Sequence, residues 1–259
     1  MKKTATVVFI VTAMVIGNAN KLFANDDKKT ETTIENPCAV STPYNVDWKK
    51  QLFNGLKKQN VGSWGVNVVM LGDSITALWR NSNYADGVEV MKKYRKEYKN
   101  INPYSFAISG DESQNTLWQI TEGDILNNIN CKVITLMIGI NSLNRKKTSE
   151  QVAEGIKVTV ETIRSKKPQA QILLLAVWPC WDAKNPIRNK ITKTNEIIKE
   201  LASDDKITYM DLGAHFINPD GEMNKKLVRD GIHLTEEGYE MWGSIMFPVI
   251  SEMIAAKNK

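Results

Sequence analysis

A serine in the first third of the chain has the setting of a nucleophile. Ser74 ends a Gly-Asp-Ser triplet that follows the apolar run Val66–Leu71. At a strand-to-helix turn, a serine hydroxyl lies beside backbone N–H groups and the positive end of a helix, and both favour a developing oxyanion. Taken alone, these residues are more typical of an ordinary turn in which serine caps a helix.

A serine nucleophile needs a base, and the base needs a carboxylate that holds its tautomer. The chain has two histidines, and His233 follows Asp230 by three residues, just before a helix-start signal at Thr235. His215 has Asp211 as its nearest upstream acid, inside a predicted strand. The pattern therefore favours His233 as base and Asp230 as acid. His215 is interpreted as a surface or packing residue.

Two further residues are suitable oxyanion donors. Gly110 and Asn141 each follow an apolar run, and a glycine N–H or an asparagine amide can hydrogen-bond the oxygen of a tetrahedral intermediate. Seen singly, each is also what a turn or loop contains.

The elements that must position these residues alternate between strands and helices. Helical spacing occurs behind a capping box from Thr148 to Gln151, and in a segment that begins with Asn185 as N-cap and Pro186 at the first helical position. Strands are predicted at Val66–Leu71, Tyr104–Ile108, Val133–Ile138, Gln171–Val177 and Ile207–Leu212. This alternation predicts a parallel sheet covered by helices on both faces, with working residues beyond the carboxyl ends of the strands.

The four features occur in one order along the chain, and the first three stand just beyond predicted strand ends. Gly-Asp-Ser, the isolated glycine, Gly-x-Asn and Asp-x-x-His are the blocks of the SGNH (GDSL-type) hydrolases, which the chain resembles from about Val66 to its last helix. It is most similar to the catalytic subunits of intracellular platelet-activating-factor acetylhydrolases and their bacterial relatives. Residues 110–118 and 185–190 look like counterparts of theirs.

The resemblance implies a three-layer α/β/α sandwich with a flavodoxin-like five-stranded parallel sheet. It implies Ser74 as nucleophile, His233 as general base and Asp230 as the acid that orients it. The oxyanion hole would consist of the backbone N–H groups of Ser74 and Gly110 and the Asn141 amide. No metal or organic cofactor is implied. Pairing into a homodimer is suggested by related subunits, although the sequence shows no interface.

Four positions bear on substrate choice or depart from the family. Ser142 stands where most members have aspartate, and Ile75 replaces the leucine of the family's nickname. Ile75 is β-branched and stiff at χ1, so it would limit an acyl pocket that it faced. Trp178 and Trp181 follow the fourth strand, where they would stack on sugar faces or pack over the sheet.

The resulting expectation is a secreted serine carboxylic-ester hydrolase that removes short acyl groups, preferably acetyl from a carbohydrate. A lysophospholipase or general short-chain esterase is the enzymatic alternative. A non-catalytic binding module on a hydrolase fold is the alternative from another class. The full set of five groups argues against this last alternative, because a decayed enzyme usually loses at least one of them.

Composition is ordinary for one soluble domain with a sizeable core, at 259 residues, 42% hydrophobic and 24% charged. The formal charge of +5 includes three lysines in residues 1–24, so the chain without them would carry +2. That bias is too weak for a nucleic-acid partner. Three cysteines, at spacings that match no zinc motif, leave at least one thiol unpaired. A bridge from Cys131 to Cys180 is disfavoured because they lie at opposite ends of the sheet.

The N-terminus reads as an export signal. Lys2 and Lys3 precede an apolar stretch over residues 5–17, and small residues follow at Ala19 and Ala24, either of which would suit cleavage. The apolar stretch is too short to span a bilayer, so no stable membrane anchor is expected after cleavage. We therefore expect a signal peptide at 1–24, a polar disordered lead-in at 25–43 and a hydrolase domain at 44–259, exported to the periplasm or exterior of a bacterium.

Overall fold

The computed structural model describes residues 35–59, 61–80 and 86–256. The predicted signal peptide and residues 25–34 of the predicted lead-in lie outside this range. Residues 35–43, which the sequence assigns to the disordered lead-in, instead pack against the domain. The Cys38 side chain is fully buried, the Asn36 amide donates to the Gln151 carbonyl at 2.9 Å, and the Ser113 hydroxyl donates to the Cys38 carbonyl at 3.0 Å.

A single five-stranded sheet forms the centre of the described domain, with every pair of neighbouring strands parallel. The spatial order β2-β1-β3-β4-β5 is the flavodoxin-like one, so the direction of winding changes between β1 and β3. The strands are β1 Val68–Gly72, β2 Pro103–Ser105, β3 Val133–Met137, β4 Gln171–Leu175 and β5 Ile207–Met210.

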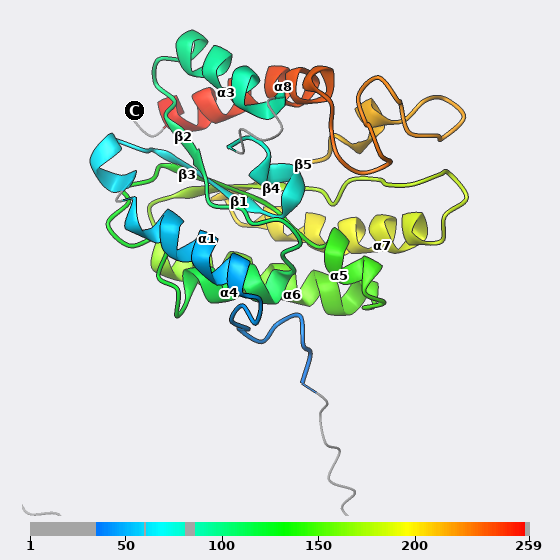
Figure 1. Ribbon diagram of the computed structural model, residues 1–259, viewed down its shortest axis with the longest axis horizontal. Coiled ribbons are helices and arrows are strands. Elements are labelled where there is room, and N and C mark those ends of the chain that lie inside the picture. Colours follow the sequence, from blue (N-terminus) through cyan, green and yellow to red (C-terminus); the bar gives the residue numbers. More distant parts are fainter. Residues whose placement is uncertain (1–34, 60, 81–85, 257–259) are drawn as a thin grey trace, which may run out of the picture. The chain divides into compact units, whose positions relative to one another are not determined.

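Helices cover both faces of the sheet, which gives the three layers expected for this fold class (Figure 1). One layer holds α3 Asp86–Glu97 and α8 Glu236–Ala256. The other holds α1 Asp47–Lys58, α4 Ser113–Ile120, α5 Ile140–Asn144, α6 Ser149–Lys166 and α7 Ile187–Lys199. The one-turn helix α2 Ser74–Ala77 continues directly from β1. No helix in the described ranges is long and apolar enough to cross a membrane.

The core explains why the strands read as unbroken apolar runs. Successive side chains of a strand point to opposite faces, and both faces are buried in β1 and β3 and in β4 after its first residue. Val69 and Leu71 belong to the cluster under α1, α4, α6 and α7, whereas Val68 and Met70 belong to the cluster under α3 and α8. Both predicted helical stripes are confirmed by the burial of residues such as Ile156 and Ile191.

The predictions for the N-termini of two helices agree with the structure to different degrees. The capping box from Thr148 to Gln151 is confirmed, with both of its hydrogen bonds present. The N-cap of α7 is Pro186, one residue later than the predicted Asn185, but the Asn185 side chain still accepts the Ile187 N–H at 3.1 Å. Cys38, Cys131 and Cys180 are all buried and form no disulfide, as expected for the last two.

Candidate active site

Ser74, His233 and Asp230 form a continuous hydrogen-bonded chain. The Ser74 Oγ lies 2.9 Å from His233 Nε2, and the Asp230 Oδ2 lies 2.7 Å from His233 Nδ1. Serine and histidine are 159 positions apart in sequence, so only the fold brings them together. The carboxylate favours the tautomer that carries a proton on Nδ1, which leaves Nε2 free to accept the serine proton.

The turn between β1 and α2 places the serine. Gly72 lies so close to the neighbouring strand that a Cβ there would approach the Met137 carbonyl oxygen to 2.4 Å, which only glycine avoids. Asp73 is the N-cap of α2, and its Oδ1 accepts the Ile75 N–H at 3.1 Å. From the far side, the Tyr239 hydroxyl on α8 donates to the Ile75 carbonyl at 2.7 Å. These contacts to the backbone on either side of Ser74 thus fix its position.

The loop that carries Asp230 and His233 is held in place by several hydrogen bonds. Asp230 Oδ1 accepts the backbone N–H groups of Ile232 and His233 at 3.1 and 2.7 Å. The Arg229 guanidinium donates to the Leu234 carbonyl at 2.9 Å across the base of the loop. Partial burial acts to raise the pKa of Asp230. Hydrogen bonds from the His233 backbone and ring, together with attraction to the imidazolium, outweigh that effect and hold the pKa below its usual value.

Gly110 and Asn141 lie beside the serine at the point where the winding of the sheet changes. Together with Ser74 and His233 they line one cavity of about 440 Å³. Gly110 has a φ of +75°, a conformation that L side chains rarely adopt. The Asn141 Nδ2 donates to the Asp111 carbonyl at 2.9 Å, and an amide nitrogen carries a second N–H that remains for a ligand.

A buried polar network lies directly behind Gly110, and sequence analysis did not find it. The Asp111 side chain has no exposed surface, and its Oδ1 lies 2.9 Å from the Lys49 Nζ of α1. Its Oδ2 accepts from the Tyr44 hydroxyl at 2.7 Å and from the Gln119 amide at 2.8 Å. The acid next to the isolated glycine was the available signal, but two of its three partners, Lys49 and Tyr44, are 62 and 67 positions away.

Burial shifts the protonation of the two carboxyls beside the serine. It raises the pKa of Asp111 to about 6, against the attraction of Lys49 and the hydrogen bonds from Lys49, Tyr44 and Gln119. It raises the pKa of Asp73 to about 7. The Ile75 N–H opposes that rise, and the Asp111 charge adds to it. Lys49 lowers the pKa of both carboxyls, so α1 supplies the positive charge of this cluster.

Two substrate-contact predictions are wrong. Ile75 is buried in the core under α3 and α8 and does not line the cavity, because the first turn of α2 directs it away from Ser74. Leu78, one position after α2 ends, supplies the apolar wall instead. Trp178 is also buried, stacked on Phe216 with ring centroids 4.5 Å apart, so its position after β4 did not predict its direction.

Trp181 does reach the region beside the loop of the acid and base. Its backbone N–H donates to the Gly231 carbonyl at 2.9 Å, and a Cβ on Gly231 would lie 3.0 Å from the indole ring. His215 is exposed in the short turn after β5 and takes no part in the site. Across the described ranges, no group of three or more His, Cys, Asp or Glu residues is arranged to hold a metal ion.

Comparison with known families agrees with this geometry. The model of the GDSL-like Lipase/Acylhydrolase family matches residues 70–241, and the chain belongs to that family. It is therefore a hydrolase of the GDSL class, as the sequence motifs predicted.

Individual relatives and solved structures are similar to the chain over most of its length. The chain is 32% identical over 177 residues to platelet-activating factor acetylhydrolase IB subunit alpha2 of Homo sapiens, covering 67% of this chain and 71% of that protein. It is 30% identical over 173 residues to subunit alpha1 of Bos taurus, covering 66% and 69%. In structure it resembles a GDSL-like lipase from Bacteroides thetaiotaomicron, with a TM-score of 0.60, 19% identity and coverage of 79% and 98%. An acetyl xylan esterase matches with a TM-score of 0.57, 20% identity and coverage of 70% and 100%.

Proposed function

We propose that the protein is a serine ester hydrolase in which Ser74, His233 and Asp230 act as a catalytic triad. The observation that carries this proposal is the unbroken hydrogen-bonded chain from the Ser74 Oγ through both ring nitrogens of His233 to the Asp230 carboxylate. Its three members lie at the carboxyl end of the sheet, where ligands bind in open α/β folds.

The reaction proceeds in two acyl-transfer steps. The Ser74 Oγ attacks the ester carbonyl while its proton passes to His233 Nε2, and Asp230 stabilises the resulting imidazolium. The carbonyl oxygen becomes an oxyanion that accepts hydrogen bonds from the N–H groups of Ser74 and Gly110 and from the Asn141 amide. The intermediate collapses, and the departing alkoxide takes the proton from His233. Water then repeats the sequence on the acyl-enzyme, releasing the acid and restoring the serine.

The cavity around Ser74 favours a short acyl group. Leu78 is its one large apolar side chain, and the other lining residues are polar or glycine: Ser74, Ser109, Gly110, Asn141, Arg229, Asp230 and His233. A pocket that admits a longer chain gains about 0.8 kcal/mol for each buried methylene. With Leu78 as the one large apolar side chain in the lining, the cavity offers few apolar side chains to a longer acyl chain, so acetyl and propionyl esters are the expected substrates.

The preferred substrate is an acetylated carbohydrate. The name of the mammalian relatives identifies them as acetylhydrolases, in line with a short acyl group. The fold is shared with an acetyl xylan esterase, although at 20% identity that likeness concerns the fold alone. Export through the N-terminal signal would give the enzyme access to polysaccharides outside the cell. Pairing into a homodimer stays a prediction.

A fluorophosphonate probe and a series of nitrophenyl esters test the proposal. The probe should label the wild-type chain but not Ser74→Ala, as read by intact mass. The value of kcat/KM should be highest for acetate or propionate and decline from butyrate onward. Absence of labelling would favour a non-catalytic binding module. Activity that climbs from acetate through octanoate would favour a lysophospholipase.

A further inference from the structure

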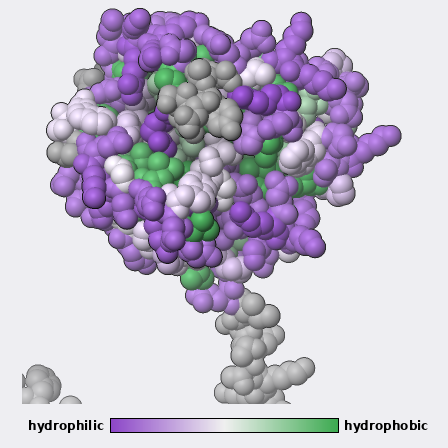
Figure 2. Space-filling view, viewed as in Figure 1, coloured by the Kyte–Doolittle hydropathy of each residue, from purple (hydrophilic) through white to green (hydrophobic). Residues whose placement is uncertain are grey.

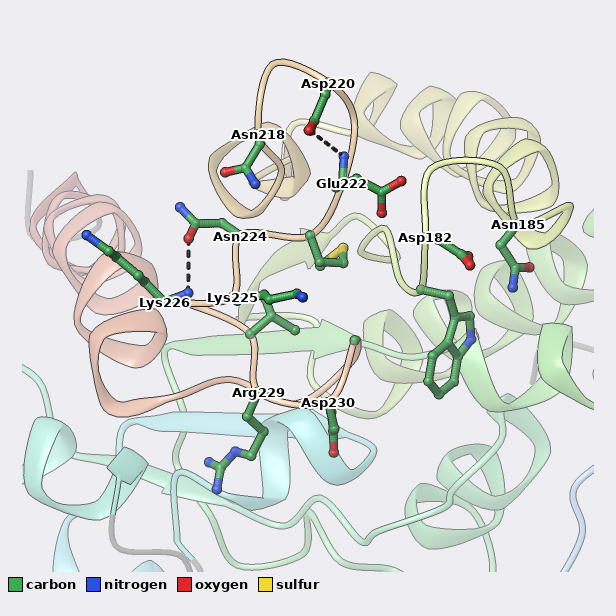
Figure 3. Close-up of a pocket in the computed structure, with 14 residues that line it drawn as sticks. Asp182, Asn185, Asn218, Asp220, Glu222, Asn224, Lys225, Lys226, Arg229 and Asp230 are labelled. Carbon is green, nitrogen blue, oxygen red and sulfur yellow. Dashed lines mark hydrogen bonds between the residues drawn. The ribbon is translucent and has the colours of Figure 1, made fainter.

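A second and larger cavity lies beside the catalytic one. It is a groove of about 900 Å³, and the labelled side chains in Figure 3 surround its opening. Asp182 and Asn185 come from the loop between β4 and α7, whereas Asn218, Asp220 and Glu222 come from the loop after β5 (Figure 3). The groove is about twice as large as the cavity around Ser74.

The groove and the catalytic cavity are neighbours. Arg229 and Asp230 line both of them, and Gly231 follows in the wall of the groove. For a molecule whose ester carbonyl lies at Ser74, the groove is therefore the adjacent large space for the rest of the molecule. In an ester hydrolase, that space accommodates the alcohol that leaves in the first step.

The walls of the groove are fixed before any ligand arrives. Arg188 of α7 donates to the Cys180 and Trp181 carbonyls at 2.6 and 2.7 Å, and across the groove to the Gly221 carbonyl at 3.3 Å. The Ala183 N–H also donates to the Glu222 carboxylate, at 3.3 Å. Both loops are thus tied to one another, which reduces the ordering cost of binding.

The chemistry of the walls suits a hydroxyl-rich, uncharged ligand. Four carboxylates, three cationic side chains and three asparagine amides line the groove, so donors and acceptors are mixed and charges nearly cancel. Trp181 supplies an indole, while the other two apolar side chains, Met223 and Val228, are 8% and 1% exposed. Large apolar side chains are thus few among the residues that line the groove. Figure 2 shows a face of the molecule that is mostly hydrophilic, with hydrophobic residues in separate areas.

We propose that this groove binds several sugar units of an uncharged, ester-bearing polysaccharide, with Trp181 as the stacking surface nearest the reacting ester. The proposal rests on the proposed function, because it assigns the leaving group of that reaction. A groove of this volume lies at the upper end of the range for organic ligand sites, well beyond the needs of one sugar. The enzyme should accordingly prefer oligomers to monomers.

Acetylated xylose and acetylated xylotetraose, compared at matched acetyl concentration, test the groove. The readout is the ratio of kcat/KM for the tetramer to that for the monomer. Because both substrates use the same triad, this ratio cancels any general loss of catalysis. We expect a wild-type ratio of about 10 or more. Trp181→Ala should lower it about 10-fold, mainly through KM of the tetramer, the factor that loss of about 1.4 kcal/mol of binding gives.

Two more variants test whether polar side chains of the groove bind the substrate. Asp182→Ala and Asn218→Ala remove side chains that line the groove and make no side-chain hydrogen bonds with other described residues, and each should lower the ratio about threefold. Trp64→Ala is the matched control, because this tryptophan is 52% exposed and lies outside both cavities. It should keep the wild-type ratio.

The possible results distinguish failure of the groove assignment from failure of the proposed function. Hydrolysis of both sugars with a wild-type ratio near 1 would overturn the groove assignment and leave the proposed function standing. A high ratio that survives all three groove variants would likewise overturn it. Hydrolysis of lysophosphatidylcholine with no action on either sugar would overturn the carbohydrate assignment and the groove proposal together.

Discussion

Replacing Lys49 by methionine should destabilise the protein in a way that depends on pH. Lys49 holds its ammonium 2.9 Å from the fully buried Asp111 carboxylate. If Asp111 stayed ionised in Lys49→Met, the lost attraction would cost about 6 kcal/mol at an effective dielectric constant of about 20. The carboxyl has a cheaper alternative, which is to take up a proton.

The cost of that proton sets the size of the effect. The pKa of Asp111 in the wild-type fold is about 6. Protonating it at pH 7.5 therefore costs about 2 kcal/mol, at about 1.4 kcal/mol for each pH unit. Near pH 5.5 the carboxyl is already largely protonated with Lys49 present, so loss of the lysine costs little. Asp73, whose pKa Lys49 also lowers, changes in the same direction.

The sign follows from proton binding. Between pH 6 and 7.5, folded Lys49→Met holds a proton that the folded wild type has released, while the two unfolded chains are alike. Stability of the variant therefore falls relative to wild type as pH rises. The deficit in the free energy of unfolding should be about 2 kcal/mol at pH 7.5 and about 0.5 kcal/mol or less at pH 5.5.

Urea unfolding followed by circular dichroism at the two pH values measures this difference. Lys50→Met is the matched control, because Lys50 is the next residue of α1 and pairs at 3.3 Å with the exposed Asp47. It should cost less than about 0.5 kcal/mol at either pH. An equal deficit for Lys49→Met at both pH values, or none at pH 7.5, would show that Lys49 does not stabilise the ionised form of Asp111.

Three other substitutions probe the site. Asn141→Ala should lower kcat for an acetyl ester by roughly 10²–10³ with little change in KM, whereas a raised KM with unchanged kcat would make Asn141 a binding residue. Gly110→Ala should lower the free energy of unfolding by about 1–2 kcal/mol, because the φ of +75° is strained for alanine while the added Cβ meets only the Lys49 ammonium group at 3.5 Å. A variant as stable as wild type in urea would show that the turn relaxes. Asp230→Asn should reduce kcat about 10⁴-fold by favouring the wrong tautomer of His233, and a loss under tenfold would remove Asp230 from the triad.

The parts of the fold that depend on local pattern could be predicted from the sequence. All five strands lie within their predicted runs apart from small differences at the ends. For β1, β3 and β4 the reason is that strands with both faces buried must be almost entirely apolar. The run at Tyr104–Ile108 extends beyond β2, which ends at Ser105. Its last residues still follow β1, with Phe106 and Ile108 donating to the Met70 and Gly72 carbonyls.

The direction in which a side chain points, and its contacts with residues far away in the sequence, could not be predicted. The sequence allows the residue after Ser74 to face either the cavity or the core, and the helical turn of α2 directs Ile75 into the core. Trp178 and Trp181 stand three positions apart, yet one stacks on Phe216 and the other lines the groove. Lys49 belongs to a helix that precedes the family's motifs, so no motif spacing indicates its contact with Asp111.

A comparison of Ser74→Ala, His233→Ala and the double variant on an acetyl ester tests the proposed triad. If Ser74 and His233 act as one unit, each single substitution lowers kcat by about 10⁴-fold or more, and the double variant is no worse than either. Strictly multiplicative losses would contradict a shared proton transfer. Near-normal turnover by His233→Ala, with His215→Ala inactive, would contradict the assignment of His233 as the base and with it the proposed triad of Ser74, His233 and Asp230.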